Sequence, residues 1–172
     1  MATGAVLPDL AAAVGSIRAL FDAAACSVAL LDDDGGSLEF VAADGAGADA
    51  IVGTRLPVSR GIVGWVALTG QPIAVAEVAA DARFARDVAE ATDYIPSVVL
   101  AAPLPGSDDD VLGVMELLDP GRGAGEAVLG NQRGSAAELS VLTALAVRVA
   151  EAVRLSRPTE PLAPGEDPGP GR

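Results

Sequence analysis

The sequence predicts an α+β fold in which one antiparallel sheet lies between two layers of helices. Residues 98–104 and 111–118 are almost continuously apolar, and a polar turn at residues 106–110 separates them. A hairpin that is apolar on both sides needs cover on both of its faces. Helical patterns precede and follow the strands. We therefore expect three layers, with the terminal helices on one face and shorter internal helices on the other.

Length and composition fit one domain with flexible ends. The 172 residues are 51% hydrophobic, with a mean hydropathy of +0.42, which is enough to fill one core. We place a flexible N-terminus at residues 1–6 and the domain at residues 7–157. Residues 158–172 form a Pro/Gly/acidic tail that has too little apolar surface to fold, so we expect it to be disordered.

The first elements are a helix and a hairpin. Pro8 and Asp9 favour a helix start, and an apolar stripe at helical spacing continues toward an expected end near Ala25. Residues 26–31 and 37–42 are predicted strands, joined by the turn sequence DDDGG. Three successive aspartates raise the alternative of a calcium site. The spacing does not match an EF-hand loop, so a solvated turn is favoured.

The middle and end of the chain add short elements and one long helix. Residues 45–57 predict one short helix and one short strand, and a helix beginning near Ile62 is expected to stop at Gly70. A brief strand at residues 73–76 and a helical or loop-like segment at residues 81–93 follow. After a Gly-rich loop at residues 121–134, the capping box SAAE opens a helix that runs to about Arg157.

Charge and residue inventory exclude several function classes. The net charge of −13 repels nucleic acid and anionic lipid, and no Lys/Arg cluster offsets it, so we expect neither partner. No histidine is present, which removes Ser-His and Cys-His catalysis and most zinc sites, so no metal is expected. The single cysteine, Cys26, is expected to be a small buried hydrophobe. No apolar run is long enough for a membrane helix, and we expect a cytoplasmic protein.

Three blocks in order resemble a GAF domain. The first comprises RGIVGWV at residues 60–66, TGQP at 69–72 and DARF at 81–84; the others are IPSVVLAAPL at 95–104 and LGVMELL at 112–118. The resemblance covers about residues 7–157. It implies a GAF-like (PAS-like) antiparallel sheet, a small-molecule pocket on one face, and terminal helices that often dimerise.

Departures from the family pattern narrow the range of ligand classes that we expect. Haem- and bilin-binding members depend on His or Cys at the pocket, and methionine-sulfoxide-reducing members use several cysteines; this chain has no His and one Cys. Asp119 to Arg122 stands where members that bind cyclic nucleotides carry an Asn-Lys signature. The resemblance therefore implies no cofactor and an unidentified small-molecule ligand.

The pocket candidates combine aromatic walls with a few polar groups. Trp65, Phe84 and Tyr94 are placed near the pocket by the resemblance, although each could be plain core. Glu116 interrupts an apolar strand and either faces a ligand or pairs with a backbone amide or Arg on the strand face. Ligand contacts are expected from Ile62, Trp65, Phe84, Asp93, Tyr94, Ser97, Leu100 and Glu116.

The expected function is a non-enzymatic regulatory domain that senses a small molecule and signals through dimerisation or a partner protein. A ligand-free scaffold for protein interaction is the alternative, and an enzyme built on Glu116 alone is the least favoured hypothesis because nothing supplies its partner. The homodimer surface is expected on the terminal helices, at Leu10, Val14, Ile17, Phe21, Leu142, Leu145 and Val149.

Overall fold

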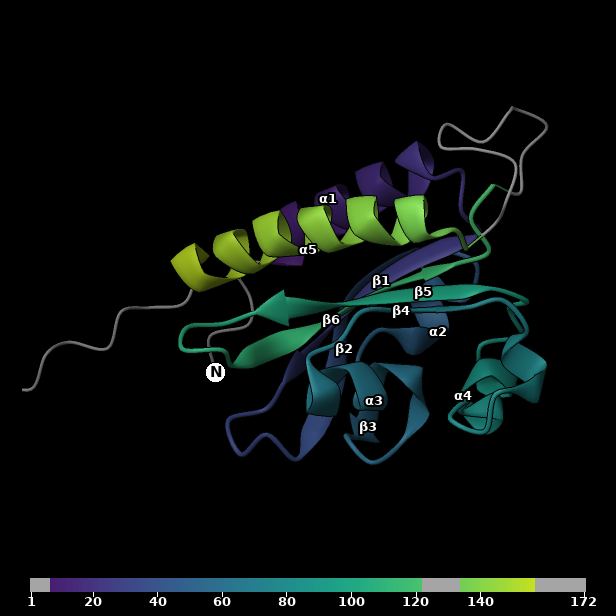
Figure 1. Cartoon of the computed structure of the whole chain (residues 1–172), viewed down its shortest axis with the longest axis horizontal. Helices are drawn as coiled ribbons and strands as arrows, with labels where there is room; N and C mark the ends of the chain where they lie inside the picture. The colour runs from purple at the N-terminus through teal and green to yellow at the C-terminus, as the bar shows by residue number, and fades with distance from the viewer. Residues whose placement is uncertain (1–6, 122–133, 157–172) are drawn as a thin grey trace, which may run out of the picture.

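The computed structural model describes residues 7–121 and 134–156 as a six-stranded, entirely antiparallel sheet with helices on both faces (Figure 1). The sheet order is β3-β2-β1-β6-β5-β4. The strands are β1 (Ala25–Leu31), β2 (Ser37–Gly45), β3 (Arg55–Pro57), β4 (Ile73–Val75), β5 (Val99–Pro105) and β6 (Val111–Leu118). The helices are α1 (Leu7–Leu20), α2 (Ala48–Ile51), α3 (Gly61–Thr69), the 3-10 turn η1 (Val78–Ala80), α4 (Arg86–Ala91) and α5 (Ala136–Ser156). The α+β fold class predicted from the sequence is confirmed.

The two terminal helices cover one face of the sheet. α1 contacts β1 and β2, whereas α5 lies mainly over β5, and both helices appear above the sheet in Figure 1. Sheet side chains that face these helices include Leu100, Leu104, Met115 and Leu117, all fully buried in the same cluster. Burial of these apolar surfaces is the main force that holds the helices against the sheet.

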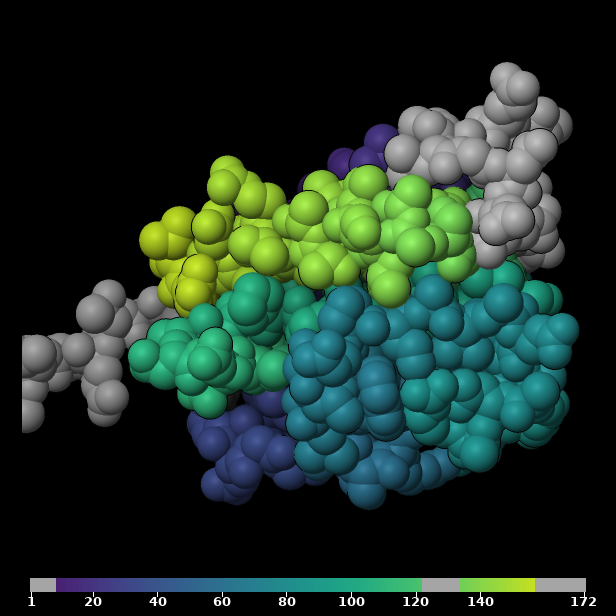
Figure 2. Space-filling view, in the orientation of Figure 1, coloured from purple at the N-terminus to yellow at the C-terminus, as the bar shows by residue number. Residues whose placement is uncertain are grey.

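The internal segments cover the opposite face. There Phe40, Val99 and Val114 pack against the buried side of α3, which contributes Ile62 and Val66. Figure 2 shows α5 as a continuous ridge along one side of the molecule and the teal segment around α3 and α4 on the opposite side. Successive residues of β5 and β6 therefore alternate between two apolar clusters, which explains why both strands are apolar throughout.

The expected dimer residues belong to the core of the single chain, which corrects the sequence prediction. Their side chains pack against the sheet, so they are unavailable to a second copy of the folded chain. Six are buried and Leu145 is half-buried against the same cluster; the buried set is Leu10, Val14, Ile17, Phe21, Leu142 and Val149. An amphipathic stripe marks the face that a helix buries, and in this fold the sheet takes that face.

Element boundaries follow local signals closely, with differences at the end of α1 and at the end of β2, which runs to Gly45 rather than to residue 42. α1 ends at Leu20 rather than near Ala25, because a turn with Asp22 at a φ of 47° leads the chain into β1. Gly70 ends α3 with a φ of 65°, as predicted. The capping box is present: Ser135 N donates to Glu138 Oε2 at 3.0 Å, and Glu138 N donates to Ser135 Oγ at 3.2 Å.

The DDDGG sequence forms the predicted turn between β1 and β2. Asp32 accepts hydrogen bonds from Gly36 N at 2.9 Å and from the Ser37 hydroxyl at 2.6 Å. These bonds lower the pKa of Asp32, with the Ser37 hydroxyl as the largest cause. The segment 1–6, residues 122–133 of the Gly-rich loop, and residues 157–172 lie outside the described residues.

Candidate functional site

A mostly apolar cavity lies on the face of the sheet that α1 and α5 leave uncovered. Its floor comes from β1, β2, β5 and β6, and its walls come from α2, α3 and the segment that contains α4. The cavity volume is about 80 Å³. A cavity needs roughly 10–15 Å³ on this measure for each water molecule, so the space fits a ligand of only a handful of non-hydrogen atoms.

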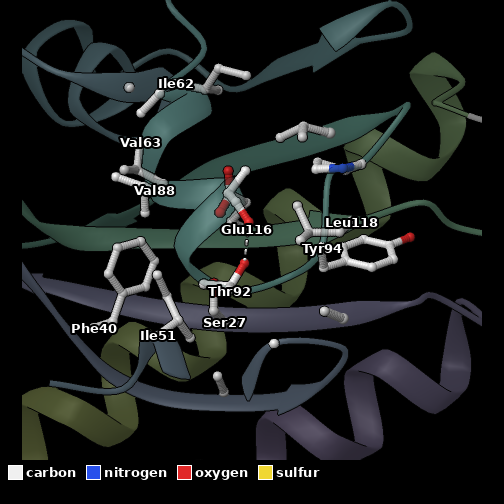
Figure 3. A pocket seen from close by; sticks show the side chains of 18 of the residues that line it. Ser27, Phe40, Ile51, Ile62, Val63, Val88, Thr92, Tyr94, Glu116 and Leu118 are labelled. Atoms are coloured by element: carbon white, nitrogen blue, oxygen red, sulfur yellow. Dashed lines mark hydrogen bonds between the residues drawn. The ribbon is translucent and has the colours of Figure 1, made fainter. Parts of the chain in front are cut away.

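Aromatic and aliphatic side chains form most of the cavity wall. Three of the five aromatic residues of the chain contribute to it: Phe40 from β2, Phe84 before α4, and Tyr94 after α4. Ile62 and Val63 of α3 close another side (Figure 3). Such a wall binds through apolar burial and leaves orientation to a few polar groups.

Glu116 is the acidic group of this cavity. It lies in the middle of β6, between Val114 and Leu118, which face the same side of the sheet. No hydrogen bond or ion pair joins the Glu116 carboxyl to a described residue, and the half-buried side chain borders the cavity (Figure 3). Burial raises the pKa of Glu116 to about 7.

Two hydroxyl groups share the cavity with Glu116. Ser27 of β1 stands directly opposite Glu116 in the β1–β6 pairing, and this buried residue lines the cavity. Thr92 follows α4, and its hydroxyl donates to the carbonyl of Ala89 at 2.9 Å. The oxygen-bearing side chains among the described lining residues are therefore the Glu116 carboxyl, these two hydroxyls and the phenol of Tyr94. The Tyr94 hydroxyl points away from the centre of the cavity (Figure 3).

The Tyr94 hydroxyl is held by a buried residue outside the cavity. It donates a hydrogen bond to Asp119 Oδ2, while Asp119 Oδ1 accepts from Ser97 N at 3.0 Å and from Val98 N at 2.9 Å. Asp119 is 5% exposed and follows β6 directly. This carboxylate therefore ties the segment that walls the cavity to the end of the strand that carries Glu116.

Trp65 lies beside the cavity and not in it. Its ring packs within the cluster around α3, and the guanidinium of Arg83 stacks on it at 4.9 Å from the ring centroid. Asp81 fixes that guanidinium through bonds of 2.8 Å to Nε and 2.5 Å to Nη2. The Arg83 contact lowers the pKa of Asp81 to about 2. The pair anchors the segment before α4 to α3.

The structure thus brings half of the predicted pocket residues together. Ile62, Phe84, Tyr94 and Glu116 line the cavity. The other four lie elsewhere: Leu100 faces α1 and α5, Trp65 is under Arg83, and Asp93 and Ser97 are exposed. Leu100 falls on the wrong face because its parity along β5 is opposite to that of Val99, which does line the cavity.

Sequence reasoning missed several lining residues. Ser27 and Phe40 come from the first hairpin, and Val88 and Thr92 from the segment around α4. Leu38 and Phe40 alternate along β2, and this alternation could have predicted that both side chains face the same side of the sheet, which is the side covered by α3. Nothing local to Ser27 marks it, because its role comes from its cross-strand position opposite Glu116.

Other candidate chemistry is sparse in the described part of the chain. Cys26 is buried, and desolvation is the largest cause that raises its thiol pKa to about 12. Over residues 7–121 and 134–156, no group of three or more His, Cys, Asp or Glu side chains is placed to hold a metal ion. Within those same ranges, every helix is too short or too polar to cross a bilayer.

Comparisons with solved structures give the same architecture at low sequence identity. The GAF domain of an Acinetobacter phosphoenolpyruvate-protein phosphotransferase superposes with a TM-score of 0.70 and 20% identity, over 89% of this chain and 84% of that one. A methyl-accepting chemotaxis protein (residues 122 to 287) gives 0.69 and 16%, over 88% and 90%. The type II free methionine-R-sulfoxide reductase of Thermoplasma acidophilum gives 0.64 and 11%, over 90% and 96%.

The family assignment rests on the sequence match together with this architecture. The GAF domain family matches residues 10–153, which span α1 to α5 and include every strand of the sheet. The blocks at residues 60–66, 95–104 and 112–118 form α3, β5 and β6, the elements that build one side of the cavity. The chain belongs to the GAF domain family.

Proposed function

We propose that this chain is a non-enzymatic regulatory GAF domain that senses a small molecule in the cavity beneath α3 and α4. The observation that carries the proposal is Glu116, a carboxyl that faces an apolar cavity with no hydrogen-bonding partner among the described residues. A carboxyl partly removed from water without a hydrogen-bonding partner costs stability, and such costs persist where they serve binding. The domain 7–157 is the proposed functional unit, in a cytoplasmic protein.

Chemistry argues against an enzyme of the reductase type found among its structural neighbours. A thiol must ionise to act as a nucleophile, and the Cys26 pKa of about 12 leaves almost no thiolate near neutral pH. The chain contains no second cysteine to resolve an oxidised first one and no histidine to activate it. We therefore assign binding, not turnover, to the cavity.

Occupancy of the cavity has a structural route to the terminal helices. β1 and β6 carry cavity residues on one face and pack against α1 or α5 on the other. A ligand that shifts Ser27 or Glu116 acts on the same strands that seat Val28 and Met115 beneath the helices. The proposed output is a change in homodimer geometry or in binding of a partner protein.

The proposed contact surface is the outward side of the terminal helices, in place of their buried stripes. Leu20 of α1 is 47% exposed, and Val147 and Leu155 of α5 are 39% and 88% exposed. Light scattering coupled to size exclusion, at high micromolar concentration, is expected to report a dimer that Leu155→Glu weakens. A monomer at that concentration would remove dimer geometry as the output and leave partner binding.

The test of the sensing proposal is direct binding. Native mass spectrometry and Trp65 fluorescence against a panel of amines, carboxylic acids, nucleobases and neutral metabolites are expected to find a ligand that Val63→Phe, which fills the cavity from α3, excludes. The alternative, a ligand-free interaction scaffold, draws on the small cavity volume of about 80 Å³. Absence of binding from every class of the panel would favour that scaffold.

A further inference from the structure

The charged and polar groups of the cavity define the chemistry of its ligand more narrowly than the proposed function requires. Glu116 lies on the cavity side of β6, and its cross-strand neighbours are Ser27 on β1 and Ala101 on β5. Neither neighbour donates a hydrogen bond to it in the described structure. A ligand in the cavity can supply the complementary donor that no described residue supplies, and such a donor offsets the cost of removing the carboxyl from water.

No cation of the protein compensates this carboxyl within the described wall. The sequence contains no lysine or histidine, and its eleven basic residues are all arginine. Four arginines adjoin lining residues in sequence. Arg83 pairs with Asp81 and stacks on Trp65, Arg60 pairs with Asp87 at 2.6 Å, Arg55 pairs with Glu39, and Arg86 is exposed on α4. Among the described residues that line the cavity, there is no arginine.

The remaining wall suits an organic cation with a small apolar body. Phe40 and Phe84 contribute aromatic side chains to the cavity wall, and aromatic faces attract organic cations. Aliphatic side chains of α3 and α4 fill the rest of the wall and would cover a hydrocarbon part. The net charge of −13 adds a long-range field that draws cations toward the protein.

We propose that the cavity recognises a small primary ammonium compound, with the Glu116 carboxylate bound to the ammonium group and the apolar wall around its hydrocarbon part. The assignment rests on the proposed sensing function and narrows it to one ligand class. Ser27 accepts one further N–H of the ammonium group from the opposite strand. The small cavity limits the ligand to roughly five to eight non-hydrogen atoms.

The test uses pairs of compounds that share a shape and differ in charge. n-Butylammonium is compared with 1-butanol, and benzylammonium with benzyl alcohol, by isothermal titration calorimetry or ligand-observed NMR at pH 8. The expected result is at least tenfold tighter binding of each ammonium compound than of its alcohol. Butyrate, which would meet the Glu116 carboxylate with like charge, is expected not to bind.

Two variants separate the effect of the Glu116 carboxylate on binding from the effect of the overall negative charge. Glu116→Gln removes the acceptor charge in the cavity, and Glu90→Gln removes the same charge from an exposed position on α4. We expect Glu116→Gln to reduce the ratio of ammonium affinity to alcohol affinity to near one. Glu90→Gln should leave this ratio unchanged. Circular dichroism and thermal unfolding establish that both variants fold.

The pH profile gives an independent readout. Ammonium binding needs the carboxylate form, so affinity is expected to rise as pH increases through about 7, the pKa to which burial raises Glu116. The other titratable groups among the described lining residues are the Cys26 thiol, whose pKa is raised to about 12, and the Tyr94 phenol, which is bonded to Asp119. Glu116→Gln is expected to flatten the profile.

Several outcomes would overturn the amine assignment. Equal binding of ammonium compounds and alcohols, or selectivity that persists in Glu116→Gln, would leave a ligand pocket of another class, and the proposed sensing function would stand. Tighter binding of butyramide at low pH would assign a protonated Glu116 that donates to a carbonyl. If no probe binds, the amine assignment fails, and the wider panel then decides the proposed function separately.

Discussion

The Tyr94 hydroxyl donates a hydrogen bond to Asp119 Oδ2, which links the wall of the cavity to the strand beneath it. Asp119 also accepts from the backbone amides of Ser97 and Val98, so one buried carboxylate holds three donors from the segment between α4 and β5. Its own backbone amide donates to the Val98 carbonyl at 2.9 Å. The geometry of the cavity therefore depends on a residue that does not line it.

Asp119→Ala is expected to destabilise the fold by about 3 kcal/mol, because three donors, including the buried Val98 amide, lose their acceptor and alanine tolerates the φ of 47° poorly. Urea unfolding measures the loss. Asp93→Ala is the matched control, since Asp93 has a φ of 55° but is exposed. Equal losses at the two positions would attribute the effect to backbone strain and contradict the role of the hydrogen bonds.

Glu116→Gln is expected to become progressively more stable than the natural chain as pH rises. The folded pKa of about 7 lies above the ordinary glutamate pKa of 4.5, so the folded state binds the proton more tightly. The contribution of this group to stability is therefore lost as pH rises from 4.5 through 7. Between pH 5 and pH 8 the difference in unfolding free energy should grow by roughly 2–3 kcal/mol.

Chemical denaturation across that pH range checks the prediction for Glu116. Glu90→Gln, which changes an exposed carboxylate, should run parallel to the natural chain. A Glu116→Gln difference that stays constant with pH would mean that the Glu116 carboxyl titrates alike in both states. The prediction also separates stability from binding, because the variant that gains stability is expected to lose the ligand.

Gly64→Ala is expected to displace α3 and destabilise the protein by about 2 kcal/mol. A Cβ at this position would lie 2.4 Å from the Val58 carbonyl oxygen, which is backbone and cannot move aside easily. Gly36→Ala, where a Cβ meets no atom within 4 Å, should change stability by less than about 0.5 kcal/mol. Thermal unfolding compares them, and equal effects would show that α3 does not pack tightly on residue 58.

Arg83→Met is expected to expose Trp65 while costing at most about 1 kcal/mol, because the lost contacts are partly solvated. Trp65 is the only tryptophan, so acrylamide quenching of its fluorescence reports this site alone. Arg86→Met removes the same charge from an exposed position on α4 and should leave quenching unchanged. Identical quenching in the two variants would mean that Arg83 does not cover the ring.

Hydrophobic periodicity and helix-end signals in the sequence were sufficient to predict the fold. The uninterrupted apolar character of β5 and β6 required cover on both faces, and the structure supplies it from two clusters. Gly70 and the Ser135 capping box marked helix ends by local chemistry that does not depend on the rest of the chain. Such signals act over a few residues, so they remain legible without tertiary information.

The site depended on relationships that local patterns do not contain. Alternation along β6 places Glu116 opposite in face to Met115 and Leu117, but only the packing of the helices decides which face holds the cavity. The same ambiguity assigned Leu100 to the cavity and the buried stripes of α1 and α5 to a dimer surface. Sequence alone determined that the chain forms a sheet covered on both faces. Only the tertiary structure decided which side is hollow, because pairing Ser27 with Glu116 and closing the cavity with Tyr94 and Asp119 join residues far apart in the chain.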